Sequence, residues 1–437
     1  MLSTSADVST VVSAPREWTT APEWFAKLQT DAWREFESEP YPVRTDELWR
    51  FSSIKNLGLD SYLPASEQGE WDPQFLSGRA FGKPAGRLIF VNERMVSCEV
   101  FDRPLVDRGV LFLSLERALE EHPELLREHF MAQPARLGSR KFAALHKASV
   151  RSGSVVFIPR HVEVVQPFEV FHFVSSDRAA VFPHTLVIAE EGSKVTVLEN
   201  FVSIDESRTG FACGVNDLVA GPGSHLTYIS TQDWSRDFVS IQINSTVADR
   251  DASVLNLSLN FGGKYSRLES VSRMIGSGAR SDMLSISVAS GEQEFDQRTL
   301  QDHLQPNTTS DLLYKNALSD RARTIFSGLI KVEPGAQRTD AYQKVRNLLL
   351  SDEAEANSMP GLEILADDVR CTHGATSGQI EPEELFYLLS RGIPDRVAKA
   401  LVVKGFLNEV VDRLPGVMVT DHLHEQIAAH LGTLATS

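Results

Sequence analysis

The sequence has few cysteines and no long hydrophobic run. Only Cys98, Cys213 and Cys371 occur in 437 residues, and so sparse and odd a set argues against a disulfide framework and for a reducing cytoplasm. Because no C-x-x-C pair is present, we expect no zinc or iron–sulfur site that this chain completes alone. No stretch of 18 apolar residues exists, so no membrane helix is expected. The first twenty residues lack a basic start and an apolar core, so we expect no secretory signal.

The motifs of several enzyme classes are also missing. Gly262-Gly263-Lys264 has neither the upstream spacing nor the following Ser or Thr of a phosphate-binding P-loop. The sequence contains no G-x-G-x-x-G, G-x-S-x-G or H-E-x-x-H pattern, which are common signals for dinucleotide binding, serine hydrolysis and zinc proteolysis. We therefore expect a protein that is not an enzyme and does not hydrolyse ATP itself.

Acidic residues outnumber basic ones. Lys and Arg total 43 against 59 Asp and Glu, which gives a formal net charge of -16. This charge repels nucleic acids and anionic membrane surfaces. The partners are therefore expected to be proteins.

The N-terminal third is predicted to be mainly helical. Residues 1–14 show no useful periodicity and are expected to form a disordered tail, followed by a mainly helical domain over residues 15–149. The firmest helix ends before Pro40 and Pro42. Its apolar residues at helical spacing are Phe25, Leu28, Ala32 and Phe36.

From about residue 150 the pattern changes to short β runs separated by turns. Four segments place a small or charged turn before an alternating strand, and their serines are Ser193, Ser224, Ser253 and Ser281. Their period of about 30 residues is typical of coil repeats, whereas a β-sandwich turns every 8 to 12 residues. We predict a parallel β-helix of six or seven coils over residues 150–378, with the pattern loosening in the polar stretch 290–315.

Residues 379–437 are predicted to form a C-terminal helical domain. Pro382 opens one helix and Gly392 ends it, and Pro394 opens the next. A stack of coils packs only neighbour on neighbour, so its ends need covering. We expect the flanking helices to cover them. The predicted fold is mainly β, a parallel β-helix flanked by N-terminal and C-terminal α-helical domains.

Two soft-metal donors, Cys371 and His373, stand two residues apart in a strand-like segment. In an extended strand, side chains at i and i+2 share a face about 6.6 Å apart, so both can serve one metal while Thr372 points away. A closed site normally needs four donors, and these two supply half of one. The alternative is structural, because a lone cysteine often behaves as a small buried hydrophobic residue, here beside a hydrogen-bonded histidine.

Two segments carry a family resemblance. Residues 328–393 include the run NLLLS, the block ADDV-x-C-x-HGAT and the helix LFYLLSRGI, and residues 44–57 read RTDELWRFSSIKNL. On these motifs the chain resembles the SufB/SufD family of iron–sulfur cluster assembly proteins, and within it the SufD branch. SufB has a cysteine in the turn after its counterpart of LLLSD, whereas this chain has Ala354 there. This departure favours SufD and argues against a role as sole scaffold.

The resemblance implies a right-handed parallel β-helix in a complex with SufB and the ABC-type ATPase SufC. It places a transient iron–sulfur cluster, or iron, at the SufB interface, with none held stably by this chain alone. It assigns His373, and less directly Cys371, to that interface. Asp367 and Asp368 are candidates for recruiting iron as hard oxygen donors, although a charged turn is the simpler interpretation. Whether a flavin binds to the complex is left open.

The resemblance also implies that the C-terminal region binds SufC. The candidate contacts are Phe386, Tyr387 and Phe406, and the alternative is that these rings only cap the β-helix. Residues 348–350 and 362–365 are predicted to lie near the end of the rod and to offer an edge to another chain, so we expect a homodimer in isolation. Two other functions stay open, a purely structural adaptor and a β-helix carbohydrate-active enzyme. The second is disfavoured because such enzymes are commonly exported.

Overall fold

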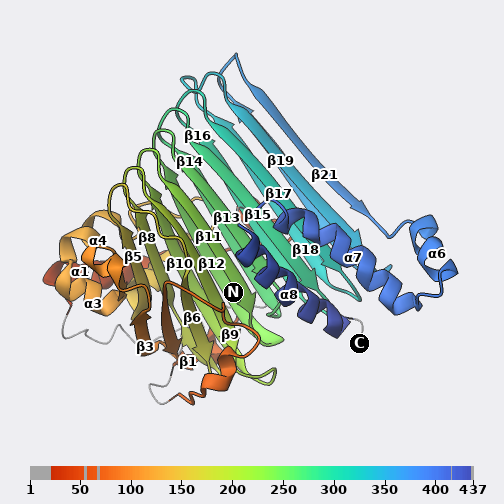
Figure 1. Cartoon of the computed structure of the whole chain (residues 1–437), viewed down its shortest axis with the longest axis horizontal. Coiled ribbons are helices and arrows are strands. Elements are labelled where there is room, and N and C mark those ends of the chain that lie inside the picture. Colours follow the sequence, from red (N-terminus) through yellow and green to blue (C-terminus); the bar gives the residue numbers. More distant parts are fainter. Residues whose placement is uncertain (1–20, 54–56, 66–68, 415, 435–437) are drawn as a thin grey trace, which may run out of the picture.

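Two β-sheets run the length of the molecule, and the chain passes from one to the other in every coil (Figure 1). The computed structural model describes residues 21–53, 57–65, 69–414 and 416–434, so the predicted tail at residues 1–14 lies outside the described residues. We call the sheet that ends at β20 sheet A and the sheet that ends at β21 sheet B. Each contributes eight parallel strands to a β-solenoid, which confirms the predicted mainly β fold and parallel β-helix.

The solenoid strands alternate between the sheets. Sheet A contains β5 (Ser152–Ile158), β8 (Pro183–Ala189), β10 (Thr209–Ala220), β12 (Asp237–Ala248), β14 (Tyr265–Met274), β16 (Glu294–His303), β18 (Arg323–Val332) and β20 (Glu355–Ile364). Sheet B contains β6 (Phe168–Val174), β9 (Lys194–Ser203), β11 (His225–Asp233), β13 (Ser253–Asn260), β15 (Arg280–Ala289), β17 (Thr309–Leu318), β19 (Asp340–Leu349) and β21 (Arg370–Gly378). The prediction of six or seven coils was too low because the first coil, β5 and β6, precedes the repeated serines.

The N-terminal region mixes helices with short strands. Its helices are α1 (Glu23–Ser38), α2 (Pro104–Asp107), α3 (Leu115–Glu121), α4 (Pro123–His129) and α5 (Arg140–Ser149). Its strands are β1 (Leu63–Pro64), β2 (Gly86–Val91), β3 (Arg94–Val100) and β4 (Leu111–Ser114), and β1 pairs with β7 (Ala179–Val181). The β2–β3 pair extends sheet B and β4 extends sheet A, and each extension ends in an antiparallel pairing. The first coils are therefore continued and covered by the N-terminal region.

The register between coils corrects the predicted repeat. Lys194, His225 and Ser253 are partners in neighbouring strands, and Ser253 is in turn the partner of Arg280. The first two predicted anchors are therefore equivalent, but the third lies one residue and the fourth two residues beyond the true column, because the coils between them differ in length. The column reads Ser193, Ser224, Ala252, Ala279, Thr308, Thr339 and Val369.

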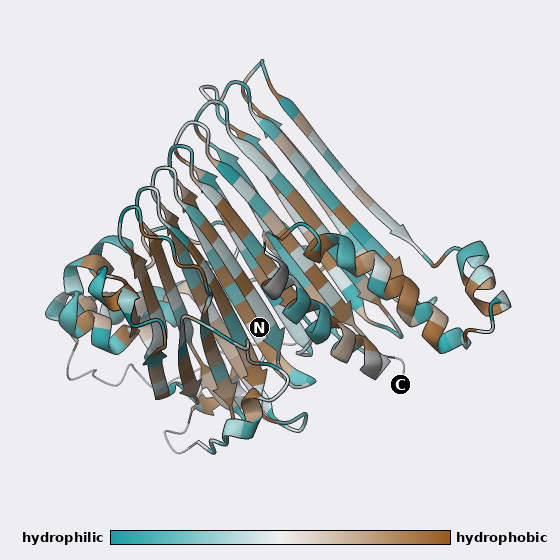
Figure 2. Cartoon of the chain, viewed as in Figure 1, coloured by the Kyte–Doolittle hydropathy of each residue, from teal (hydrophilic) through white to brown (hydrophobic). Residues whose placement is uncertain are grey.

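The sequence predicted a looser pattern in the polar stretch 290–315, and this prediction is wrong. The stretch contributes fully paired strands to the solenoid. Hydrophilic residues become frequent in the later coils (Figure 2), and all ten residues of β16 are buried. Those that face the interior bond to one another between the two sheets and between coils. Gln297 Nε2 donates to Asn316 Oδ1 at 3.2 Å, and Asn316 Nδ2 donates to Asn347 Oδ1 at 2.7 Å. Paired amides can fill this part of the interior, because a buried polar group is tolerated once it is hydrogen-bonded.

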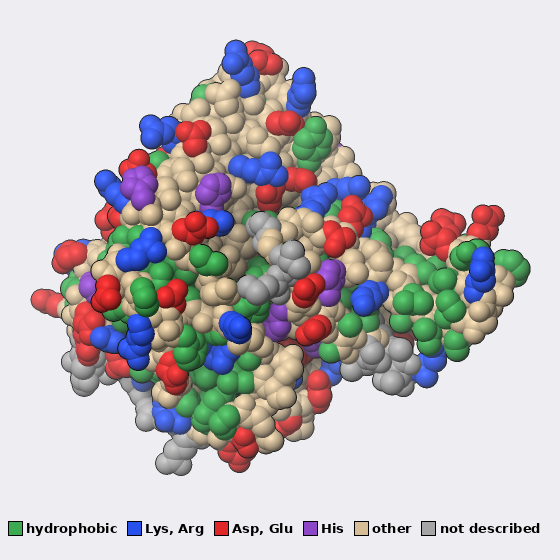
Figure 3. All heavy atoms as spheres, in the orientation of Figure 1, with side chains coloured by type: hydrophobic (Ala, Val, Ile, Leu, Met, Phe, Trp, Pro, Cys, Tyr) green, Lys and Arg blue, Asp and Glu red, His purple; other side chains and the backbone are tan. Residues whose placement is uncertain are grey.

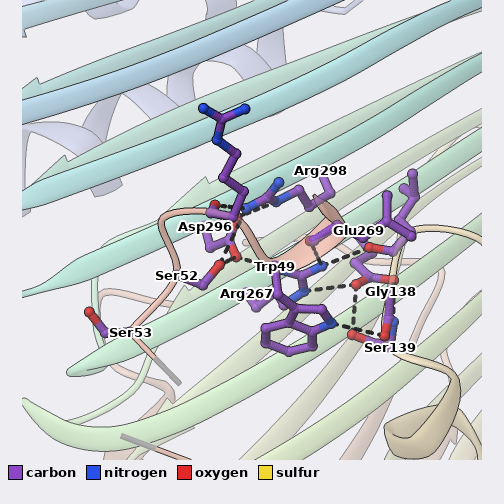
Figure 4. Close-up of polar contacts among 12 residues, drawn as sticks. Trp49, Ser52, Ser53, Gly138, Ser139, Arg267, Glu269, Asp296 and Arg298 are labelled. Atoms are coloured by element: carbon purple, nitrogen blue, oxygen red, sulfur yellow. Dashed lines mark hydrogen bonds and ion pairs between the residues drawn. The ribbon is translucent and has the colours of Figure 1, made fainter. Parts of the chain in front are cut away.

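The outer face of β14 and β16 buries four charges. Arg267, Glu269, Asp296 and Arg298 are each at most 1% exposed. Arg267 Nε donates to Glu269 Oε1 at 2.8 Å, Arg298 Nε donates to Asp296 Oδ1 at 2.6 Å, and Arg267 also donates to Asp296 (Figure 4). Burial alone would raise the pKa of Asp296, but the two guanidinium groups outweigh it and hold that pKa below its usual value. We call these four residues the arginine–carboxylate network.

The N-terminal segment that carries the RTDELWRF motif covers this network. Arg267 Nη2 donates to the carbonyl of Leu48 at 2.9 Å, and Arg298 Nη2 donates to the carbonyl of Arg50 at 2.8 Å. The ring of Trp49 lies over the Arg267 guanidinium, 3.7 Å from its carbon to the ring centroid. This part of the family-like sequence therefore attaches the N-terminal region to the solenoid.

The sequence predicted that the C-terminal helices cover the end of the rod, and this prediction is wrong. The helices are α6 (Pro382–Ser390), α7 (Asp395–Val411) and α8 (Val417–Leu434). Helices α7 and α8 lie on the outer face of sheet B, with Leu407 and Ile427 in one cluster with Leu284 and Leu313 (Figure 1). That face is apolar and must be buried, so it takes the helices. At the end of the rod, β20 is half-buried to exposed and β21 is exposed along most of its length. Among the described residues, no helix combines the length and hydrophobicity needed to cross a lipid bilayer.

Candidate functional site

The last strand of each sheet has a free edge. Within the described residues, β20 pairs only with β18 and β21 pairs only with β19. Backbone N–H and C=O groups at such an edge have no partner within the sheet, and an open edge is a template for another strand. The predicted edge segment 362–365 lies at β20, but Leu348 lies in β19 and pairs with Gly378 of β21, so that part of the predicted edge is internal.

The two edges differ in their backbone donors. The amide of Glu355 donates to the carbonyl of Ala322, directly before β18, and the amide of Arg370 donates to the carbonyl of Thr339, directly before β19. The N–H groups of alternate residues in a strand point to opposite sides. On β20 the free edge therefore includes Pro360, which has no N–H. On β21 the residues at the free edge are Cys371, His373, Ala375 and Ser377, and each of them has both a backbone N–H and a C=O group. Strand β21 is thus the better template.

Cys371 lies on β21 in register with Ala341 of β19. Its side chain is half-buried and packs against an apolar cluster that includes Ile330 and Ala341. Burial, and after it the nearby Asp340 carboxylate, raise the pKa of the Cys371 thiol above its usual value. The thiol therefore stays protonated at neutral pH until a metal displaces its proton.

His373 lies two residues further along the same strand and is exposed. It shares a face of β21 with Cys371, as the extended spacing predicted. Its register partner is Gln343, which is 2% exposed and whose side-chain amide atoms have no hydrogen-bond partner among the residues that the structure describes. Buried amides rarely lack partners, so the layer beneath His373 holds unused hydrogen-bonding capacity. The sequence signal for this layer was only the presence of Gln343 in the family-like segment.

The donors of this chain do not complete a metal site by themselves. No group of three or more His, Cys, Asp or Glu side chains that could hold a metal ion occurs within residues 21–53, 57–65, 69–414 and 416–434. Soft metals are normally bound by four donors. The donor set therefore fits a cluster only if a second chain supplies the remaining ligands.

Asp367 and Asp368 form the turn that leads into β21. The carbonyl of Asp368 accepts from the amide of Arg338 at 2.6 Å, and the amide of Asp368 donates to Gln337 Oε1 at 2.9 Å. Both aspartates are exposed. These bonds give Asp368 a role in closing the last coil, and recruitment of iron by the two carboxylates stays a prediction.

Hydrophobic side chains gather on the part of the molecule that projects beyond the sheets at α6 (Figure 3). Phe386 is 71% exposed and Tyr387 is 57% exposed. The third predicted ring, Phe406, is half-buried beneath Lys315, whose ammonium lies 4.4 Å from the ring centroid. Leu389 of α6 and Val397 and Leu401 of α7 are also exposed, and the sequence interpretation did not single them out.

Models of known protein families match most of this chain. A family model described as "SUF system FeS cluster assembly, SufBD core domain" matches residues 172–406, more than half of the chain. The chain belongs to the SufBD family. A second model, described as the SufBD protein N-terminal region, matches residues 84–170. The SufBD core match thus extends from β6, the first solenoid strand of sheet B, through β21 and α6 and into α7.

Similar proteins support a SufD-like member of the SufBD family. The chain is 28% identical over 403 residues to the iron-sulfur cluster assembly protein SufD of Bacillus subtilis, covering 90% of this chain and 91% of that protein. It is 26% identical over 407 residues to an iron-sulfur cluster assembly SufBD family protein of Staphylococcus epidermidis, covering 90% and 86%. A SufBD family protein of Staphylococcus saprophyticus is 26% identical over 408 residues, with the same coverage. The chain is therefore an iron–sulfur cluster assembly protein of the SufBD family.

Proposed function

We propose that this chain is the SufD-like subunit of a SufB–SufC–SufD complex and helps to build a nascent iron–sulfur cluster at its interface with a SufB-like subunit. The observation that carries the proposal is the position of Cys371 and His373 on the free strand of sheet B. A donor pair on an open edge is incomplete until another chain arrives, so ligation and association are coupled.

The cluster is the cargo of this site and is not held by the isolated chain. His373 is the stronger candidate ligand, because an exposed imidazole binds metal without displacing packed side chains. Cys371 must first lose a proton that burial holds on the sulfur. Both features suit a site that forms a cluster and then releases it.

The partner strand is proposed to pair with β21. Pairing along this edge uses the backbone groups of Cys371, His373, Ala375 and Ser377, whereas the β20 edge is interrupted at Pro360. Such pairing would bring a second chain next to the side chain of His373. The same edge permits pairing with a second copy, so a homodimer remains the expected state of the isolated chain.

A proline scan of the two edges tests this arrangement. Ala375→Pro removes an N–H that no strand of this chain uses, so we expect the fold to persist while partner binding weakens by at least about tenfold, the cost of a lost buried hydrogen bond and a ring clash. The matched control is Ser358→Pro on the free edge of β20, which should leave binding nearly unchanged. Binding of a purified SufB-like subunit and light scattering of the isolated chain measure both kinds of pairing. An equal loss of partner binding in the two variants would contradict strand pairing along β21.

The α6 patch is proposed to bind the ATPase SufC. Exposed apolar residues on a projecting helix are typical of helix-in-groove docking, and aromatic anchors contribute most to such interfaces. Phe406 is packed under Lys315, so it is expected to support the helices rather than to contact SufC. This chain then contributes no catalysis of its own, and ATP hydrolysis belongs to the partner.

Replacement of one aromatic residue tests the docking patch. Phe386→Ser is expected to weaken SufC binding about 30-fold, because loss of a central aromatic anchor costs about 2 kcal/mol. The matched control is Phe101→Ser, since Phe101 is also exposed, at 49%, but lies at the end of β3. Titration calorimetry with purified SufC measures both. Undiminished binding by the Phe386 variant would remove α6 from the interface.

A further inference from the structure

A cavity of about 500 Å³ lies where helix α5 and residues 131–136 meet the outer face of sheet A. Small-molecule sites commonly enclose about 300 to 1,000 Å³. Its floor includes Val215 on β10, Ile243 on β12 and Val271 on β14, and Val215 and Ile243 are register partners. Ala143 of α5 forms part of the wall. The floor therefore carries aliphatic side chains on three adjacent strands, which can contact a ring-sized apolar group. Polar side chains lie between them on the same strands, namely Asp217, Asn244, Ser245 and Glu269.

Lys147 of α5 brings a positive charge to the wall of this cavity. The two arginines at the rim are already paired, Arg136 with Asp302 at 2.9 Å and Arg140 with Glu39 at 3.0 Å. Lys147 is half-buried, and no carboxylate in the described part of the chain lies within ion-pair distance of its ammonium group. Partial burial of an unpaired ammonium is unfavourable, so an anion in the cavity would gain a charge-assisted contact.

Asp217 lies on the floor but is not a full counter-ion for this lysine. Its Oδ2 accepts from the amide of Met131 at 2.7 Å and lies 3.6 Å from His184 Nε2, which has no hydrogen-bond partner among the described residues. Burial raises the pKa of Asp217 to about 7, against the lowering effects of the Met131 amide and Lys147. At neutral pH the carboxyl therefore carries only part of a negative charge.

The backbone at the mouth of the cavity is also unusual. Met131 has a φ of 46°, a left-handed conformation that side chains other than glycine seldom adopt and that is often found at ligand clamps. The bond from its amide to the buried Asp217 holds it there. The loop over the cavity is thus fixed by a floor residue rather than by packing alone.

We propose that this cavity binds a small aromatic anion, whose charged group pairs with Lys147 and whose ring lies on Val215, Ile243 and Val271. This binding is separate from cluster assembly and does not depend on the proposed interface with a SufB-like subunit. Asp217 offers a hydrogen-bond acceptor to the ring's polar substituents.

Calorimetry on the full chain with phenyl phosphate and with benzoate tests the proposal. The two probes share a ring and differ in the anionic group, so the tighter one identifies the preferred head group. We expect one saturable site per chain. Lys147→Gln should weaken binding about tenfold, the expected loss for one charge-assisted hydrogen bond. Ala143→Trp should abolish binding by filling the cavity.

The matched control is Lys344→Gln, which makes the same charge change at an exposed position on β19 of sheet B and should bind as the unaltered chain does. Circular dichroism and thermal melting verify that each variant is folded, and the lysine variant suffices if the tryptophan does not fold. Absence of saturable binding for both probes would overturn the proposal. So would an unchanged affinity in Lys147→Gln or in a folded Ala143→Trp variant.

Discussion

Asp296→Ala is expected to lower the free energy of unfolding by about 3 to 5 kcal/mol, the usual cost of removing one partner from a buried ion pair. Asp296 accepts from Arg267 and Arg298, both at most 1% exposed. Its loss leaves two guanidinium groups facing each other in the protein interior without the carboxylate between them. The same variant also frees the segment around Ser52, whose hydroxyl bonds to Asp296. We therefore expect the N-terminal region to separate from the solenoid before the solenoid unfolds.

Urea unfolding followed by tryptophan fluorescence measures this effect, because Trp49 lies over Arg267. The matched control is Asp31→Ala, which removes a carboxylate from an exposed pair with Arg34 and should cost less than about 1 kcal/mol. If both variants were destabilised equally, the arginine–carboxylate network would not anchor the N-terminal region.

His373→Ala is expected to lower iron–sulfur cluster formation in the assembled complex by about tenfold or more while leaving the fold intact. The imidazole is exposed and makes no packing contribution that the interior needs. A lost metal ligand, however, cannot be replaced by packing, and even changes outside the ligand set commonly reduce metal affinity 10- to 100-fold. Anaerobic reconstitution with iron and sulfide, followed by visible absorbance, measures the cluster, and thermal melting measures the fold.

Cys371→Ala ranks the roles of the two donors. If the thiol is a ligand, cluster formation should fall as far as in the His373 variant, and if it only packs beside the site, the loss should be smaller. Because Cys371 touches an apolar cluster, we expect a slightly lower melting temperature for this variant alone. A His373→Ala protein that melted early, or that built cluster at the unaltered level, would leave the structural-adaptor function as the better account.

Periodicity in the sequence correctly predicted the features of the fold that depend on local residue patterns. Alternating runs and a period near 30 residues predicted the parallel β-helix, and the spacing of Cys371 and His373 placed them on one face of a strand, as observed in β21. Helical spacing likewise predicted α1 and its end before Pro40. The register was missed where Ala252 and Ala279, rather than the neighbouring serines, occupy the repeating position. A small residue fits the turn whether or not it has a hydroxyl.

Contacts between distant segments escaped the sequence interpretation. Helices α7 and α8 cover sheet B because Leu284 and Leu313 face outward there, and a strand pattern alone does not say which apolar face needs covering. The stretch 290–315 suggested a looser repeat because its side chains are polar and charged. Its charges on β16 are buried instead, under a segment about 245 residues earlier in the chain that carries Trp49 and Ser52. The interruption of the β20 edge at Pro360 could not be predicted either. It depends on which residues of β20 direct their N–H groups to the free edge, and only the register shows this.

Pulsed electron paramagnetic resonance most directly tests whether this chain supplies a cluster ligand. A complex is assembled in which only this chain carries ¹⁵N-labelled histidine, and its cluster is reduced to a paramagnetic state. We predict a strong ¹⁵N hyperfine coupling that is present in the labelled complex and absent when the labelled chain carries His373→Ala. A cluster that shows no ¹⁵N coupling, or a coupling that survives His373→Ala, would contradict the proposal that His373 binds the nascent cluster.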